Sequence, residues 1–250
     1  MLSDDANLTA ARGFPSESGP VKTPAVSGYA GTMSNLEAQP EFEQLQPGQL
    51  CTSVEVHDPR PVPLGGLRAM TVYRTLPLKQ RSLIGAWCFI DHYGPDDVAE
   101  TGGMKVARHP HTGLATVSWL FEGAVNHLDS GGVAARVKPG ELNLMLAGRG
   151  ITHQELSTDD TRTLHGVQLW YALPDAERHG DNGFEHYAPE PLKLDGGEAL
   201  VFIGELGGSK SPVNPRTTEL FGAEVRIRPN ATVKLDIQRD FEYGLSLIHI

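Results

Sequence analysis

Residues 109–123 read HPHTGLATVSWLFEG, and this stretch carries the strongest prediction of the fold. From Leu114 to Phe121 it is rich in β-branched and aromatic residues, and it ends at Glu122-Gly123. That composition, followed by a glycine, is typical of a β-strand. Immediately before the strand stand His109-Pro110-His111, and proline is tolerated at the start or edge of a strand.

Short apolar runs separated by Gly, Pro and Asp recur along the chain from Cys51 onward, at the spacing of about eight to twelve residues expected for a sandwich or barrel. Alternating leucines, as in Leu142–Leu146, are the period-2 pattern of a strand with one apolar face. Long helical patterns are scarce, so we predict an all-β chain. The further strands expected are Val133–Val137, Leu142–Leu146, His165–Leu173, Leu200–Ile203 and Leu220–Ile227.

The two ends of the chain differ from its centre. Residues 1–45 are rich in Ser, Pro, Gly, Ala, Asp and Glu, and we expect a disordered arm because little of this surface can be buried. Phe241–Ile250 predicts a strand that stops at the terminus with apolar residues exposed. Because complete proteins usually cover such an edge, we expect a fragment or an end that pairs elsewhere.

Composition limits the class of protein. The chain has 250 residues, and its 31 acidic and 21 basic side chains give a formal net charge of -10. Nucleic-acid grooves need clustered Lys and Arg, so direct nucleic-acid binding is not expected. No apolar run approaches the ~20 residues of a membrane helix, and no secretory signal is visible. Cys51 and Cys88 are too few for a disulfide framework, so we expect reduced thiols and a cytoplasmic protein.

Two histidine-containing pairs predict a metal site. His109 and His111 stand at positions i and i+2, as do His153 and Glu155, and such residues point to the same side of a strand. On adjacent strands, the two pairs would present three imidazoles and one carboxylate to one centre. A lone His-x-His is more often a surface pair than a ligand pair, but two pairs beside glycine turns favour a site. This donor set suits Fe(II), Mn, Ni, Cu, Co or Zn.

The motifs resemble those of the pirin family over roughly Val54 to Leu245, in order and spacing. The matching segments read HPHTGLATV at 109–117, LFEG at 120–123, HLDSG at 127–131, KPG at 138–140, AGRGITHQE at 147–155 and LHGVQLW at 164–170, and FIDHYGP at 89–95 also has the family's look. The chain departs from the general cupin pattern at Ala115, where many relatives have a Glu.

The resemblance implies a bicupin, in which two cupin barrels face one another and only the first binds metal. It assigns residues 46–172 to an N-terminal metal-binding cupin domain and 173–250 to a C-terminal cupin domain that is incomplete here. It also implies that His109, His111, His153 and Glu155 hold one non-haem iron, so the carboxylate ligand comes from Glu155.

The same resemblance implies two alternative functions. Several pirins are quercetin 2,3-dioxygenases, which open the central ring of a flavonol with O2 and release carbon monoxide, and Glu155 would take the proton of the substrate hydroxyl. Other pirins bind a transcription factor or a metabolic enzyme, with iron as a redox-sensitive element. We favour the dioxygenase, because function follows from the site and the expected site has positions free for substrate and oxygen.

Several other residues carry weaker predictions. His127 is either a hydrogen-bonding partner of a ligand or a polar residue on an outer strand face. His92 and His165 either line the mouth of a cavity or are structural. Trp119 and Trp170 are expected in the core. Two further charged residues are not expected to take part in the chemistry: Arg149 either anchors its loop or pairs with an acid, and Glu122 is solvated.

Overall fold

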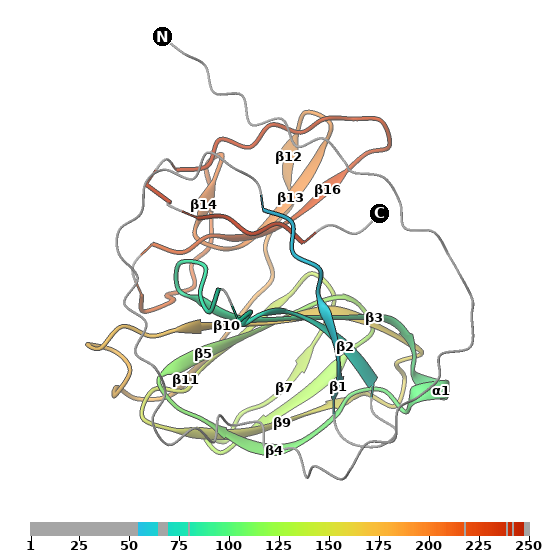
Figure 1. Ribbon diagram of the computed structural model, residues 1–250, viewed down its shortest axis with the longest axis vertical. Helices are drawn as coiled ribbons and strands as arrows, with labels where there is room; N and C mark the ends of the chain where they lie inside the picture. Colours follow the sequence, from blue (N-terminus) through green and yellow to red (C-terminus); the bar gives the residue numbers. More distant parts are fainter. Residues whose placement is uncertain are drawn as a thin grey trace. The chain divides into compact units, whose positions relative to one another are not determined.

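A computed structural model describes residues 55–64, 70–79, 81–217, 219–238, 240–241 and 243–247. Within these residues the chain is almost entirely β (Figure 1), with a single four-residue helix, α1 (Val98–Thr101). The fold is that of an all-β cupin, as predicted. The expected N-terminal arm and Cys51 lie outside the described residues.

The N-terminal part of the fold is built from two antiparallel sheets. The seven-stranded sheet runs in the order β1 (Arg60–Leu64), β2 (Met70–Leu76), β3 (Trp87–Asp97), β10 (Thr163–Ala172), β5 (Leu114–Glu122), β8 (Leu142–Leu146) and β11 (Gly183–Tyr187). The four-stranded sheet runs in the order β4 (Lys105–His111), β9 (Ile151–Ser157), β6 (Val125–Asp129) and β7 (Ala134–Val137).

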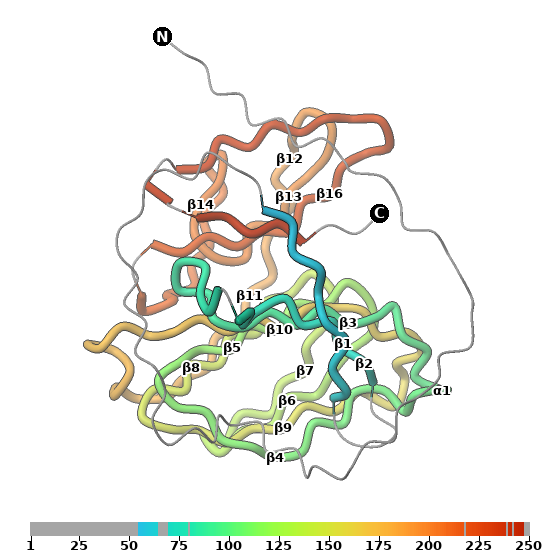
Figure 2. The backbone as a smooth tube through the Cα atoms, in the orientation of Figure 1, coloured from blue at the N-terminus to red at the C-terminus, as the bar shows by residue number. Residues whose placement is uncertain are grey.

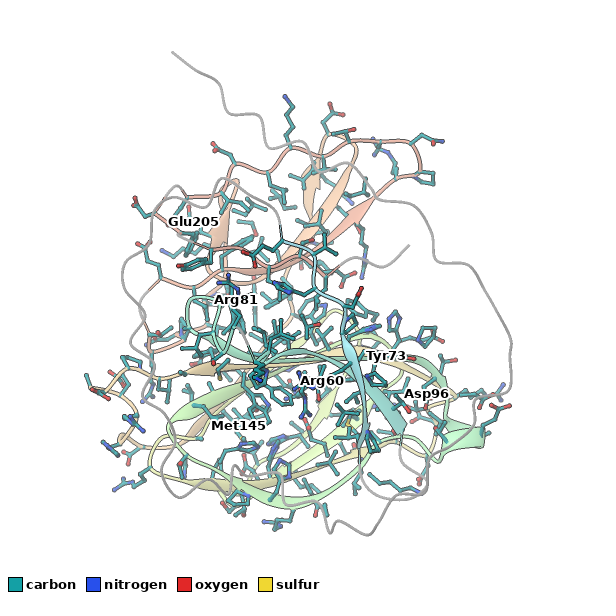
Figure 3. All side chains as sticks on the ribbon, in the orientation of Figure 1. Arg60, Tyr73, Arg81, Asp96, Met145 and Glu205 are labelled. Carbon is teal, nitrogen blue, oxygen red and sulfur yellow. The ribbon has the colours of Figure 1, made fainter. Side chains whose placement is uncertain are left out.

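The two sheets pack face to face, and side chains fill the space between them (Figure 3). One apolar cluster joins Met70, Val72 and Tyr93 of the seven-stranded sheet to Val106 and Val125 of the four-stranded sheet. Because side chains alternate along each strand, the inward face of every strand contributes to this barrel interior.

The strands predicted from the sequence are present with shifts of a few residues at their ends. Leu142–Leu146 differs in one respect, because all five of its residues are buried rather than alternate ones. The outer face of the sheet is covered as well: Trp119 packs against Phe202, and its indole N–H donates to Glu224 Oε2 at 2.8 Å. Both partners belong to the C-terminal part of the chain, so the leucines lie between two layers.

A glycine in β10 allows close packing in the sheet. A methyl group added at Gly166 would lie 2.7 Å from Leu120 Cδ2, 2.8 Å from the Trp119 carbonyl oxygen and 2.9 Å from the Tyr93 hydroxyl. Any side chain there would displace the backbone or the fully buried Tyr93 and Leu120, so the interior next to the site depends on this glycine.

The C-terminal part contains a three-stranded sheet of β12 (Leu192–Leu194), β13 (Gly197–Ile203) and β16 (Gly222–Ile227), and a hairpin of β14 (Glu205–Leu206) and β15 (Ser209–Lys210). This arrangement is consistent with a second cupin unit. The predicted terminal strand is wrong for the described residues of Phe241–Ile250, because Phe241 and residues 243–247 are not in a strand. An isolated apolar run acquires strand geometry only when a neighbouring strand pairs with its backbone.

The seven-stranded sheet includes a strand from beyond residue 173, the expected start of the second domain. β11 pairs antiparallel with β8, with His186 opposite Asn143. β11 therefore follows residue 173 in the chain but belongs to the seven-stranded sheet. In the described part of the chain, no helix is long and apolar enough to cross a membrane.

Candidate metal centre

The two histidine-containing segments lie on paired strands. β4 and β9 are antiparallel neighbours, with His109 opposite His153 and His111 opposite Ile151, and Figure 2 shows them side by side. The turn that follows β4 and the turn that precedes β9 are linked by the Gly113 N–H, which donates to the Gly148 carbonyl at 2.8 Å. Gly148 has a φ of 50°, a conformation that suits glycine.

A β-bulge orients the first pair. Val106 lies opposite Glu155 and His109 lies opposite His153, so β4 has two residues, Ala107 and Arg108, where β9 has one. Both extra residues are exposed, whereas His111 is buried and His109 is half-buried. A bulge re-aims the side chains that follow it. Here it directs both histidines into the barrel, and no pattern in residues 105–111 predicts it.

Three imidazole nitrogens converge at one point. His109 Nε2 lies 2.9 Å from His111 Nε2 and 3.1 Å from His153 Nε2, and the latter two are 3.1 Å apart. Ligands at right angles on an ion with bonds of about 2.1 Å would be separated by about 3.0 Å. The described residues therefore contain a three-nitrogen cluster with the spacing of adjacent ligands on one ion.

The protonation of the three imidazoles also fits a role as metal ligands. His109 Nδ1 lies 2.8 Å from the Ala107 carbonyl, which can only accept, so this nitrogen carries the proton and, in the neutral ring, Nε2 presents a lone pair. Burial, reinforced by His109, lowers the pKa of His111 to about 4. Burial and the surrounding histidines lower the pKa of His153 to about 2, so both rings are neutral at pH 7.

Neutral imidazoles with lone pairs facing one another at this distance repel unless a cation lies among them. The donor set therefore fits a divalent transition ion, and the three histidines are one of two groups of possible metal ligands in the described residues. The second group is His127, His153 and Glu155.

Glu155 lies beside the imidazole cluster but is directed elsewhere. Its side chain is buried, with 5% of its surface exposed, and Oε1 accepts a hydrogen bond from the Ser118 hydroxyl at 3.0 Å. Burial raises the pKa of Glu155, although His127 and Ser118 oppose this shift. The structure thus groups three of the four predicted ligands through their Nε2 atoms, and it groups Glu155 with His127 and His153.

His127 faces the barrel interior, so its alternative placement on an outer strand face is wrong. It lies opposite Glu155 in the β6–β9 pairing and has 2% of its surface exposed. His127 Nδ1 is 3.4 Å from His153 Nδ1, and His127 Nε2 is 3.3 Å from Asp129 Oδ2. If the Asp129 carboxylate accepts from His127 Nε2–H, His127 Nδ1 can accept from His153 Nδ1–H. This order of donors leaves the His153 Nε2 lone pair facing the cluster.

Aromatic and charged side chains face the histidines from the seven-stranded sheet. Trp170 stacks on Phe89 with ring centroids 3.8 Å apart and contacts His111 edge-on at 4.8 Å. Arg74 lies over the other ring of this stack, 4.3 Å from the Phe89 centroid, and makes two 2.8 Å hydrogen bonds to Asp91. Trp170 is half-buried beside the site rather than in the core, because its side chain contacts His111 of β4.

The remaining predicted residues lie outside the cluster. His92 and His165 contact each other at 3.1 Å between Nε2 atoms, beside Tyr73 and Phe121; strand alternation puts His92 on the face opposite Asp91. Trp119 is a core residue, as expected. The loop residue Arg149 forms an ion pair with Asp181, and Glu122 is exposed.

The family model for pirin matches residues 67–171, which include every residue of the imidazole cluster, Glu155, His127 and Asp129. Residues 67–171 form a pirin domain. The matched residues contain the motifs HPHTGLATV at 109–117 and AGRGITHQE at 147–155, on which the sequence resemblance to pirins rests.

Relatives of this pirin domain bear two kinds of name. A Pseudomonas aeruginosa protein named "Putative quercetin 2,3-dioxygenase" is 40% identical over 187 residues, which are 74% of this chain and 58% of that protein. Human pirin is 38% identical over 128 residues, 49% of this chain and 43% of its own length. A crystal structure titled quercetin 2,3-dioxygenase, from Acinetobacter baumannii, has 40% identity and a TM-score of 0.64, covering 68% of this chain and 56% of that one. The chain thus spans less than two thirds of these relatives' lengths.

Proposed function

We propose that this protein is a metal-dependent dioxygenase that opens the central ring of a flavonol such as quercetin with release of carbon monoxide. The observation that carries the proposal is the convergence of His109, His111 and His153 at 2.9–3.1 Å inside a barrel. The relatives named as quercetin dioxygenases support the substrate class. Fe(II) is the proposed ion, with Mn, Ni, Cu, Co or Zn as alternatives on the chemistry of the donors.

The proposed ligands are His109, His111, His153 and Glu155. A bound divalent ion would act as a Lewis acid and template, lowering the pKa of a substrate hydroxyl and orienting the ring for oxygen. For Glu155 to bind the same ion as the histidines, its side chain would turn away from Ser118 Oγ, which lies 3.0 Å from Oε1. A carboxylate also accepts protons, so Glu155 is the proposed base.

Each neighbouring residue has a separate role in this proposal. Glu155 takes the proton of the flavonol 3-hydroxyl. The Phe89–Trp170 stack gives a flat apolar surface next to His111, which would orient a planar ring and exclude water from it. O2 then adds across the central ring, which opens, and one carbon leaves as carbon monoxide.

The test is metal analysis of protein purified without oxygen, followed by quercetin turnover in air. We expect stoichiometric iron and loss of quercetin with release of carbon monoxide in the wild type, and neither in His153→Ala. Iron without turnover would overturn the dioxygenase proposal. A protein that takes up no divalent metal would overturn the metal site itself.

The regulatory alternative from the sequence makes a different demand on Glu155. In an enzyme, Glu155→Gln abolishes turnover while iron remains bound to the histidines. In a redox-sensitive regulator there is no turnover to lose, and oxidation of the iron changes the binding of a protein partner instead. Measuring both properties on the same variant separates the two functions.

A further inference from the structure

One row of side chains crosses the inward face of the seven-stranded sheet and is polar at every position. Each member lies directly opposite the next in the strand pairing. The members, from β2 to β11, are Arg74, Asp91, Gln168, Ser118, Asn143 and His186.

The rows on either side are mainly apolar. One contains Val72, Tyr93, Gly166 and Leu120, and the other contains Phe89, Trp170, Thr116, Met145 and Phe184. Inside a barrel, a polar side chain costs free energy unless its hydrogen bonds are made. Three members of the polar row, Asp91, Ser118 and Asn143, are nevertheless buried, which is expensive and points to a use for the row.

The hydrogen bonds of this row are incomplete at two amides. Arg74 pairs with Asp91, Ser118 Oγ is 2.9 Å from Gln168 Oε1, and His186 Nδ1 is 2.6 Å from Asn143 Oδ1. Among the described residues, Gln168 Nε2 and Asn143 Nδ2 are buried atoms with no hydrogen-bond partner. Turning either amide by 180° exchanges an unpaired donor for an unpaired acceptor, so one end of each stays free.

Both amides flank the part of the row that touches the site. Ser118 lies between them in the pairing, and its hydroxyl is also 3.0 Å from Glu155 Oε1 on the opposite sheet. Asn143 is 97% buried, given its 3% exposed surface. Gln168 faces inward from a central strand and is half-buried, and its unpaired Nε2 is itself buried.

We propose that Asn143 and Gln168 are specificity-determining residues, which bind the hydroxyl and carbonyl oxygens along one edge of a planar ligand held beside the histidine cluster and the Phe89–Trp170 stack. An amide can donate or accept, and a hydroxyl can accept or donate, so the pair matches a polyhydroxylated ring rather than an apolar one. This inference rests on the proposed function, because it assigns the ligand's orientation in the same site.

The test compares two ligands on three variants. Gln168→Met and Asn143→Leu remove each amide with little change of volume, and Asn126→Leu removes an exposed amide on β6 as the matched control. Metal-loaded protein is kept free of oxygen so that no turnover occurs. Quenching of tryptophan fluorescence then gives the Kd for quercetin and for flavone, which lacks the hydroxyls, and thermal unfolding without ligand is measured in parallel.

We expect Gln168→Met and Asn143→Leu each to weaken quercetin binding about tenfold. Flavone binding should change less than about twofold. The unfolding temperature should fall only slightly, because each amide makes one hydrogen bond in the ligand-free protein, Gln168 with Ser118 and Asn143 with His186. Asn126→Leu should bind both ligands as the wild type does.

Three results would overturn the inference. Quercetin affinity within twofold of wild type would show that the amides do not contact the ligand. Equal weakening for both ligands with lower unfolding temperatures would show that the row is structural. Failure of the wild type to bind quercetin would exclude the ligand class. The two proposals can also fail separately. If the variants lose quercetin binding selectively but the wild type does not turn quercetin over, this inference stands and the proposed function is overturned.

Discussion

The four-stranded and seven-stranded sheets face each other across one interior, yet they carry different chemistry. The four-stranded sheet supplies the converging nitrogens of His109, His111 and His153, together with the buried His127 and Asp129. The seven-stranded sheet supplies aromatic and amide groups and, on its other face, the contacts of Trp119 with the C-terminal part. Because the two functions depend on different sheets, we expect metal binding and packing to be separable by substitution.

The largest effect should follow from removing a nitrogen of the four-stranded sheet. His153→Ala should weaken metal binding by more than about a hundredfold. Loss of a residue that only hydrogen-bonds a ligand costs up to about a hundredfold, and loss of the ligand itself should cost more. Metal content after dialysis and calorimetric titration would measure it. His179→Ala, which removes an exposed histidine, is the control. Equal loss in both variants would contradict the assignment.

The second prediction separates the two walls by changing the seven-stranded sheet. Trp119→Ala should lower the free energy of unfolding by about 4 kcal/mol, because a fully buried indole and its bond to Glu224 are lost. Metal affinity of the folded fraction should stay the same. Urea unfolding and metal titration would measure the two quantities, and Trp119→Phe should be milder. A parallel loss of metal affinity would show that the walls are coupled.

A smaller effect is expected at the hydrogen-bonded chain behind His153. Asp129→Asn should reduce metal affinity by about 10- to 100-fold, because the amide no longer fixes which nitrogen of His127, and through it of His153, carries the proton. Asp160→Asn, in an exposed ion pair with Arg136, is the matched control. If Asp129→Asn binds metal as tightly as the wild type, His127 does not orient His153.

The last prediction concerns the pH dependence of stability in the metal-free protein. Burial lowers the pKa of His111 from 6.5 to about 4. Between these values the unfolded chain binds more protons than the folded one, so stability falls as the pH falls from about 6.5 towards 4. Urea midpoints of chelator-treated protein at several pH values would measure this loss. His111→Gln should show a shallower dependence, and an identical slope in both proteins would contradict the prediction.

The local sequence pattern was sufficient to predict features that depend on a single strand. The period-2 spacing of His109 with His111 and of His153 with Glu155 predicted that each pair shares a face. Runs such as Leu114–Phe121 predicted strands that the structure contains. The all-β class and the likeness to pirin followed from the same stretches, because turns, alternation and motif order are encoded by neighbouring residues.

Tertiary structure decided what depends on residues distant in the chain. The bulge at Ala107–Arg108, the inward position of His127, the place of Trp170 beside His111 and the polar row through Gln168 and Asn143 arise from strand pairing. The direction of Glu155 towards Ser118 has the same origin. Register across a sheet is set by packing and hydrogen bonding between strands. The sequence therefore determined which side chains share a strand face, and the fold determined which of those faces meet.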